Sequence, residues 1–267
     1  MTSAYHVDPI GCFPQEQIFG MGRIGLVVRK GNLAVKLPLR WSSSSDDEMK
    51  ANIECLQHEQ PIYQRLGQCA GVVPCLGFTK TSIQLQLMEN GDLRCYLGQN
   101  KASKSLQLRW FRTMARALAR IHDRRILVVD IASRNFLLDS ELSISFCGYT
   151  ESTILPLSTC MQTVDGGYSI QTDIEQLGAV MYEVIVGDKC KFDIWESAPP
   201  DATRGVWPPR EGLPRTNEIW LGSIIEKCWT QGAYLSAYDL YKELDFVELD
   251  DEPSPLMLGV EDTNNLC

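Results

Sequence analysis

The sequence predicts an α+β fold with two lobes, in which a β-rich lobe comes first and an α-helical lobe follows. Short apolar runs separated by turn residues dominate the chain up to residue 90, and amphipathic helical patterns dominate the remainder. A chain of 267 residues can bury one large core or two lobes that share a cleft. We therefore divide it into an N-terminal extension (1–17), a first lobe (18–90), a second lobe (91–248) and an acidic tail (249–267) that we expect to be mobile.

The first lobe begins with a predicted β-hairpin, formed by the runs IFGMGRIGLVV and LAVKLPL on either side of Gly31-Asn32. The polar break WSSSSDDE suits the start of a helix. Residues 48–66 follow with apolar side chains on a helical period, which predicts a helix that Pro61 bends, because proline removes a backbone donor. Two further strands are expected at VVPCLGFT and SIQLQLME.

The second lobe is expected to be mainly helical. Its helices are predicted from LRCYLGQ, from the strongly amphipathic SLQLRWFRTMARALARIHD, and from TDIEQLGAVMYEVIVG and TNEIWLGSIIEKCW. Short strands are expected around ILVVD and NFLLD, between the second and third of these helices.

Composition limits the classes of partner. The net charge is −9 and no long run of Lys or Arg occurs, so we expect no nucleic-acid partner. The most apolar helical run, LGAVMYEVIVG, is too short for a bilayer and contains Glu183, so we expect no membrane span. Ten scattered cysteines without a CxxC pair, and an N-terminus without a signal-peptide pattern, favour a reducing, cytoplasmic location.

A glycine pattern in the first hairpin indicates a phosphate-binding loop. Gly20, Gly22, Gly25 and Val27 form G-x-G-x-x-G-x-V between two expected strands, where a dinucleotide-binding fingerprint would need a strand and a helix. Glycines let the backbone approach phosphate oxygens closely. Lys36 lies on the next strand, eleven residues past Gly25, where it becomes a candidate phosphate ligand.

With this glycine loop and strand lysine, residues 18–246 resemble the protein kinase superfamily. The resemblance implies ATP binding, with Lys36 paired to a helix glutamate. Glu59 matches that glutamate best, and Glu54 is the alternative. It further implies that Val27, Ala34 and Leu137 enclose adenine, that Leu85 is the gatekeeper, and that the backbone at Leu87 contacts adenine.

The segment VVDIASRNFLLD resembles the catalytic loop of the superfamily. Asp130 and Asn135 keep the separation of H-R-D-x-x-x-x-N, which implies a catalytic base and a metal ligand. Arg134 is typical of the tyrosine-kinase version of this loop. Val128 and Val129 replace the usual His and Arg, and this Arg normally pairs with a phosphorylated activation loop.

The metal-binding aspartate expected thirteen residues past Asn135 is absent, because the sequence there is Gly148-Tyr149-Thr150. The alternative register, Phe146-Cys147-Gly148, contains no acid either. Mg²⁺ usually takes one or two carboxylates besides phosphate oxygens, so a Mg²⁺ site is doubtful, with Asn135 as a weak ligand and Glu151 as a conceivable substitute. The A-P-E motif and its arginine partner after Cys228-Trp229 are missing together.

Two structural supports are expected, one that aligns the two lobes and one within the second lobe. The resemblance implies that Tyr63, Val128 and Tyr149 stack as an apolar column, and that Asp173 accepts backbone hydrogen bonds from the catalytic loop.

The favoured hypothesis is a nucleotide-binding pseudokinase that signals through conformation or protein partners. The alternatives are an active protein kinase with unconventional metal binding, an interaction scaffold with an empty cleft, and a small-molecule kinase.

Overall fold

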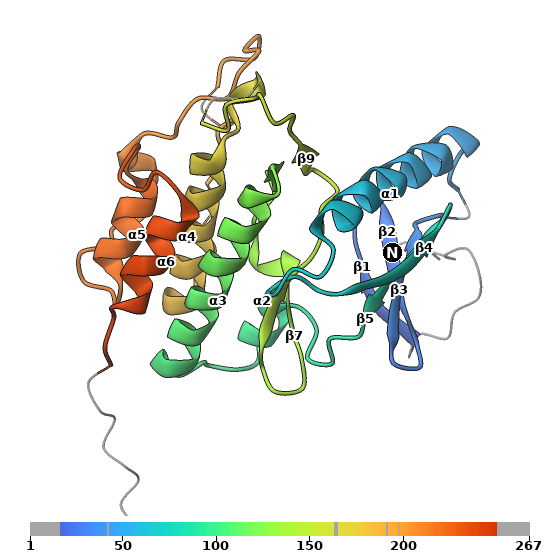
Figure 1. The fold of residues 1–267 in the computed structure, drawn as a ribbon, viewed down its shortest axis with the longest axis horizontal. Coiled ribbons are helices and arrows are strands. Elements are labelled where there is room, and N and C mark those ends of the chain that lie inside the picture. Colours follow the sequence, from blue (N-terminus) through green and yellow to red (C-terminus); the bar gives the residue numbers. More distant parts are fainter. Residues whose placement is uncertain (1–16, 42, 163–164, 191, 197, 250–267) are drawn as a thin grey trace, which may run out of the picture.

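The computed structural model describes residues 17–41, 43–162, 165–190, 192–196 and 198–249. Most of the expected N-terminal extension and nearly all of the acidic tail lie outside these residues. An antiparallel sheet with one helix forms one side of the molecule and a helical part forms the other (Figure 1). This arrangement confirms the predicted α+β class and its β-rich-first order. The proposed division at residue 90 falls in the connection between strand β5 and helix α2.

The sheet has five strands in the order β1-β2-β3-β5-β4. Their bounds are β1 Ile18–Met21, β2 Gly25–Lys30, β3 Leu33–Pro38, β4 Cys75–Thr79 and β5 Ser82–Gln86. The β2–β3 hairpin turns at Gly31, whose φ of +61° is a conformation that glycine adopts without strain. The register pairs Val27 with Lys36, which fixes the strand lysine behind the glycine loop.

Helix α1 (Asp46–Leu66) packs beside the sheet (Figure 1). It begins two residues earlier than predicted because Ser45 and Glu48 form a reciprocal capping box. The helix continues through Pro61 as one element. Its buried side carries Leu56, Glu59, Ile62, Tyr63 and Leu66.

The helical part contains α2 Leu93–Leu97, α3 Lys104–Asp123, α4 Ile170–Val186, α5 Gly222–Trp229 and α6 Ala237–Asp245. Two small ladders pair β6 (Ile126–Leu127) with β9 (Thr153–Ile154) and β7 (Phe136–Leu138) with β8 (Ile144–Phe146). Short 3₁₀ turns lie at Ser133–Asn135, Asp165–Gly167 and Arg210–Gly212. No helix in the described ranges combines the length and apolarity that a bilayer crossing requires.

The helix expected over residues 216–229 is wrong in its first part. Leu221 has a left-handed φ of +57°, so α5 begins only at Gly222. Gly222 packs so tightly on the carbonyl of Thr216 that an added Cβ would lie 1.8 Å from that oxygen. The chain therefore bends sharply at a position where the apolar period alone predicts a continuous helix.

Candidate functional site

A cleft of about 980 Å³ lies between the sheet and the helical part. Its walls come from the β1–β2 loop, β3, α1, the connection after β5, and the loops that follow β6 and β8. The structure brings together at this cleft the predicted site residues Gly20, Gly22, Gly25, Val27, Ala34, Lys36, Glu59, Leu85, Asp130, Arg134, Asn135, Leu137 and Gly148.

Leu87 is the predicted site residue that does not line the cleft. Its side chain is buried, and its amide donates to the carbonyl of Asn32 at 3.4 Å. The neighbouring Gln86 and Met88 line the cleft instead. The expected contact between adenine and the Leu87 backbone concerns main-chain atoms and stays a prediction.

Lys36 and Glu59 form a short ion pair inside the cleft. Lys36 Nζ lies 2.5 Å from Glu59 Oε2, and the Glu59 side chain is only 1% exposed. The second carboxylate oxygen, Oε1, accepts the backbone N–H of Tyr149 at 2.7 Å. The alternative Glu54 lies on the helix surface, where it pairs loosely with Lys50 at 3.9 Å. Glu59 thus connects the strand lysine directly to the segment after Gly148.

The catalytic-loop segment is held by Asp173 at the start of α4. Its carboxylate accepts the amides of Val128 and Val129, both at 2.9 Å, and hydrogen-bonds to His122 Nε2. Val129 has a φ of +70°, an outlying conformation for a β-branched residue. The two amide bonds to a buried carboxylate keep the loop in this shape despite the backbone strain.

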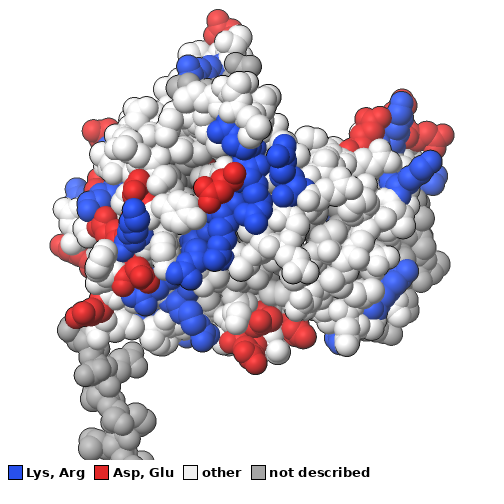
Figure 2. Space-filling model, in the orientation of Figure 1, with Lys and Arg blue, Asp and Glu red and all other residues white. Residues whose placement is uncertain are grey.

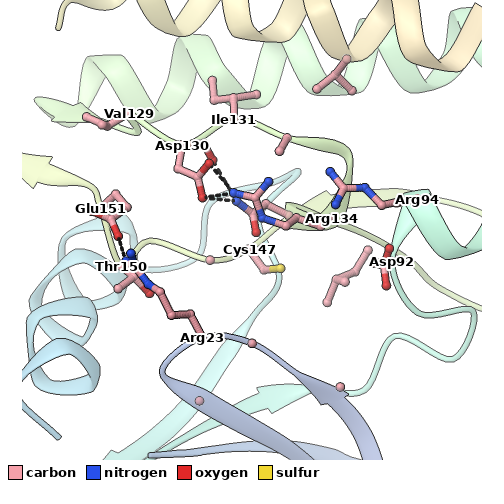
Figure 3. A pocket seen from close by; sticks show the side chains of 18 of the residues that line it. Arg23, Asp92, Arg94, Val129, Asp130, Ile131, Arg134, Cys147, Thr150 and Glu151 are labelled. Atoms are coloured by element: carbon pink, nitrogen blue, oxygen red, sulfur yellow. Dashed lines mark hydrogen bonds and ion pairs between the residues drawn. The ribbon is translucent and has the colours of Figure 1, made fainter. Parts of the chain in front are cut away.

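Asp130 faces the cleft but is engaged by its neighbours (Figure 3). The Arg134 guanidinium donates to both carboxylate oxygens at 2.6 Å. Asn135 Nδ2 donates to the Asp130 carbonyl at 2.8 Å and to its Oδ2 at 3.1 Å. The residues predicted as base and metal ligand therefore form one hydrogen-bonded cluster.

Gly148 lies against Asn135 with a φ of +80°. A Cβ at this position would lie 2.8 Å from Asn135 Oδ1, so a carboxylate here would adjoin that amide. Glu151 reaches instead across the mouth of the cleft, where it pairs with Arg23 of the glycine loop at 2.7 Å (Figure 3). Arg23 is a cleft residue that the glycine pattern alone did not single out.

The donor set does not fit a Mg²⁺ ion. Within the described ranges, no three His, Cys, Asp or Glu side chains gather in a way that would hold a metal. The carboxylate of Asp130 is bound by Arg134, and Asn135 offers a neutral amide. Cys147 also lines the cleft, and burial raises the pKa of its thiol to about 12, so it is a protonated thiol at neutral pH and no anionic ligand.

Apolar contacts anchor the segment after Gly148. Leu155, Met161 and Ile170 pack with Leu127, and Val129 lies against this cluster. The Arg125 side chain donates to the carbonyls of Pro156 and Thr159. Val129, which stands where the resemblance implies an arginine, therefore holds this segment by apolar packing and not by an ion pair.

The expected column of Tyr63, Val128 and Tyr149 is partly visible. The rings of Tyr63 and Tyr149 meet edge to face with centroids 5.2 Å apart, and all three side chains are buried. Burial raises the pKa of both tyrosines well above the usual value, so both remain neutral. This pair connects α1 to the segment after β8.

Comparison with known proteins identifies one family. Residues 19–153, just over half of the chain, match the family described as protein tyrosine and serine/threonine kinase. No curated protein matches the chain.

Proposed function

The chain belongs to the protein tyrosine and serine/threonine kinase family, and on that premise we propose that it binds ATP in its cleft as a catalytically impaired member, a pseudokinase. Nucleotide binding is general in this family. The output of such a protein is its conformation, which protein partners would recognise in signalling. A cytoplasmic location is part of the proposal, supported by the scattered cysteines.

The phosphate end of the cleft supports nucleotide binding. Lys36 is held in place by Glu59, and its backbone pairs with Val27 behind the glycine loop. The absence of a side chain at Gly25 leaves room for the aliphatic part of Lys36, because an added Cβ would lie 3.2 Å from Lys36 Cε. Val27, Ala34 and Leu137 supply apolar surface on the cleft walls, which suits a planar base.

Gly148 carries the proposal of impaired catalysis. The position that adjoins Asn135 has no carboxylate, and Glu151 is paired with Arg23. Removing one preorganised electrostatic contact to a transition state costs about 10²–10³ in rate. Loss of the principal metal ligand should cost at least as much.

A second candidate function is phosphoryl transfer with unconventional metal binding. The observation that favours it is the surviving cluster of Asp130, Arg134 and Asn135, which faces the same cleft. Glu151 would have to leave Arg23 to supply a carboxylate.

Thermal unfolding of the full chain with ATP, in EDTA and in Mg²⁺, tests the proposal. Nucleotide at about one hundred times its dissociation constant stabilises a protein by about 2.7 kcal/mol, which raises Tm by about 5 °C at this size. We expect this rise in EDTA, unchanged by metal, and absent in Lys36→Met. Lys30→Met, an exposed change at the end of β2, is the matched control and should retain the rise.

Two results would contradict the proposal. A rise that requires Mg²⁺, together with phosphate transfer to a peptide, supports the second candidate. No rise under any condition would indicate a cleft that does not take ATP.

A further inference from the structure

A row of arginines runs along the exposed side of α3 and ends at its C-cap residue, Arg124. Arg109, Arg112, Arg116, Arg120 and Arg124 follow one another at intervals of three or four residues, a spacing that places them on one face of a helix. At 1.5 Å per residue the row is about 22 Å long. Figure 2 shows it as a diagonal band of Lys and Arg side chains over α3. We call these five residues the arginine row.

Most guanidinium groups of the row donate hydrogen bonds to backbone carbonyls and not to carboxylates. Arg109, Arg120 and Arg124 donate to the carbonyls of Glu141, Ala70 and Leu66 respectively. The Arg116 guanidinium lies over the Tyr241 ring at 4.3 Å. A carbonyl neutralises no charge, so these cations keep an unbalanced field at the surface.

Few acids face the row among the described residues. Asp245 approaches Arg112 at 3.8 Å, and Asp123, at the end of α3, accepts the hydroxyl of Tyr238. Within the described residues, the row thus has one ion pair with a carboxylate, between Arg112 and Asp245, in a chain whose net charge is −9. The surplus acid of the chain must lie elsewhere.

Much of that acid follows α6 directly. Residues 248–267 contain six acidic side chains and no lysine or arginine, and four of the six fall within residues 248–252. The segment starts beside the row, because Arg112 donates to the carbonyls of Leu244, Asp245 and Val247, the last at 2.8 Å. An extended chain covers about 3.3–3.6 Å per residue, so three to five residues beyond Val247 can span about 10–18 Å from the point where Arg112 binds the chain. That span reaches Arg116 and Arg120.

We propose that the arginine row is a docking surface for an acidic peptide segment, and that its occupant is the C-terminal segment 248–267 of the same chain. The tether favours this occupant over a free acidic partner, because a short connection gives an effective concentration in the millimolar range. The segment then masks the row, and an acidic partner gains access only by displacing it. This docking is independent of the nucleotide cleft.

The test uses the full chain with charges removed from the tail, so that the fold is untouched. In the tail-neutralised variant the acids closest to α6 become amides: Glu248→Gln, Asp250→Asn, Asp251→Asn and Glu252→Gln. The probe is a fluorescein-labelled peptide with the sequence of residues 248–262, and binding is followed by fluorescence anisotropy at about 50 mM salt, where surface charges are weakly screened. If self-docking occupies the row about 90% of the time, the neutralised variant binds the probe about tenfold more tightly than the wild-type chain.

Substitutions in the arginine row are the second part of the experiment. Arg109→Gln with Arg120→Gln, added to the neutralised variant, should weaken probe binding at least fivefold. Within the described residues, the hydrogen bonds of these two side chains go only to the carbonyls named above, so the fold should persist, whereas Arg112 and Arg116 also hold α6. The matched control is Lys30→Gln with Lys80→Gln on the sheet, which should leave binding unchanged.

Three outcomes would overturn the proposal. One is equal probe binding by the wild-type and neutralised chains. Another is equal binding of a probe whose acids are amides, which would mean that charge does not drive docking. The third is tighter binding of the neutralised chain to a 12-base-pair DNA duplex or to phosphatidylserine vesicles than to the peptide probe, which would assign the row to another polyanion.

Discussion

Glu175 offers a prediction whose size follows from the structure. It lies in α4 with 1% of its surface exposed, and its Oε2 has no hydrogen-bond partner. Burial, and secondarily the charge of Asp173, raises the pKa of this carboxyl to about 10. Lys227 lines the same small crevice but pairs with Glu243 at 2.8 Å. Glu175 is therefore a neutral acid in the folded protein at pH 7.

The sign of the pH dependence follows from this raised pKa. The unfolded chain ionises Glu175 near pH 4.5, whereas the folded chain holds the proton until about pH 10. Stability associated with this group is thus fully present below pH 4.5 and is lost as pH rises toward 10. The loss amounts to about 1.4 kcal/mol per pH unit, or about 3 kcal/mol by pH 7.

Glu175→Met should remove this loss, because methionine fills a similar volume without an ionisable group. The free energy of unfolding, measured by urea titration with tryptophan fluorescence at pH 5, 6, 7 and 8, should rise relative to wild type by about 1.4 kcal/mol per pH unit. Any packing difference is independent of pH and leaves the slope unchanged. Glu218→Met, an exposed control, should show no slope. A constant difference across these pH values would refute the reasoning, since it would mean that Glu175 is ionised and compensated in the fold.

Three further predictions concern the cleft. Gly148→Asp should make the stabilisation by ATP depend on Mg²⁺, while the left-handed backbone lowers the free energy of unfolding by about 1–2 kcal/mol. Thermal unfolding with ATP in EDTA and in Mg²⁺ checks this. A rise in Tm that is the same with and without metal contradicts it. Glu59→Gln should lower the free energy of unfolding by about 3 kcal/mol in urea titrations, because Lys36 loses a buried partner; a change below 1 kcal/mol argues against it. Cys147, with its thiol pKa raised to about 12, should resist iodoacetamide at pH 8 while exposed Cys160 reacts, as followed by mass spectrometry; equal labelling would contradict it.

Most of the cleft could be predicted because its residues follow short, fixed spacings. The glycine loop and Lys36 share one hairpin, and Asp130 and Asn135 share one turn, so local rules of spacing are sufficient. The choice of Glu59 over Glu54 needed the resemblance as well, and the structure shows the former inside and the latter outside.

The remaining features depend on contacts between distant positions. Arg23 and Glu151 are 128 residues apart, and no pattern near either predicts their pairing. The late start of α5 depends on the left-handed Leu221, which the apolar period does not reveal. The arginine row is hidden for a different reason: its members are separated by three residues or fewer of other types, so a search for basic runs finds none, although the helix collects them on one face.

The substitutions around the catalytic loop are consistent with one another in physical terms. Val129 stands where the resemblance implies an arginine, whose charge would pair with a phosphorylated loop. Here the valine lies against an apolar cluster that includes Leu155 and Met161, and this cluster holds the segment without a phosphate. The apolar cluster itself offers no cation to pair with phosphate. Glu59, in contrast, binds both Lys36 and the Tyr149 amide, so any ligand that moves Lys36 also acts on the segment after Gly148. We therefore expect that a ligand controls conformation from the cleft that holds Lys36, and not from the apolar cluster.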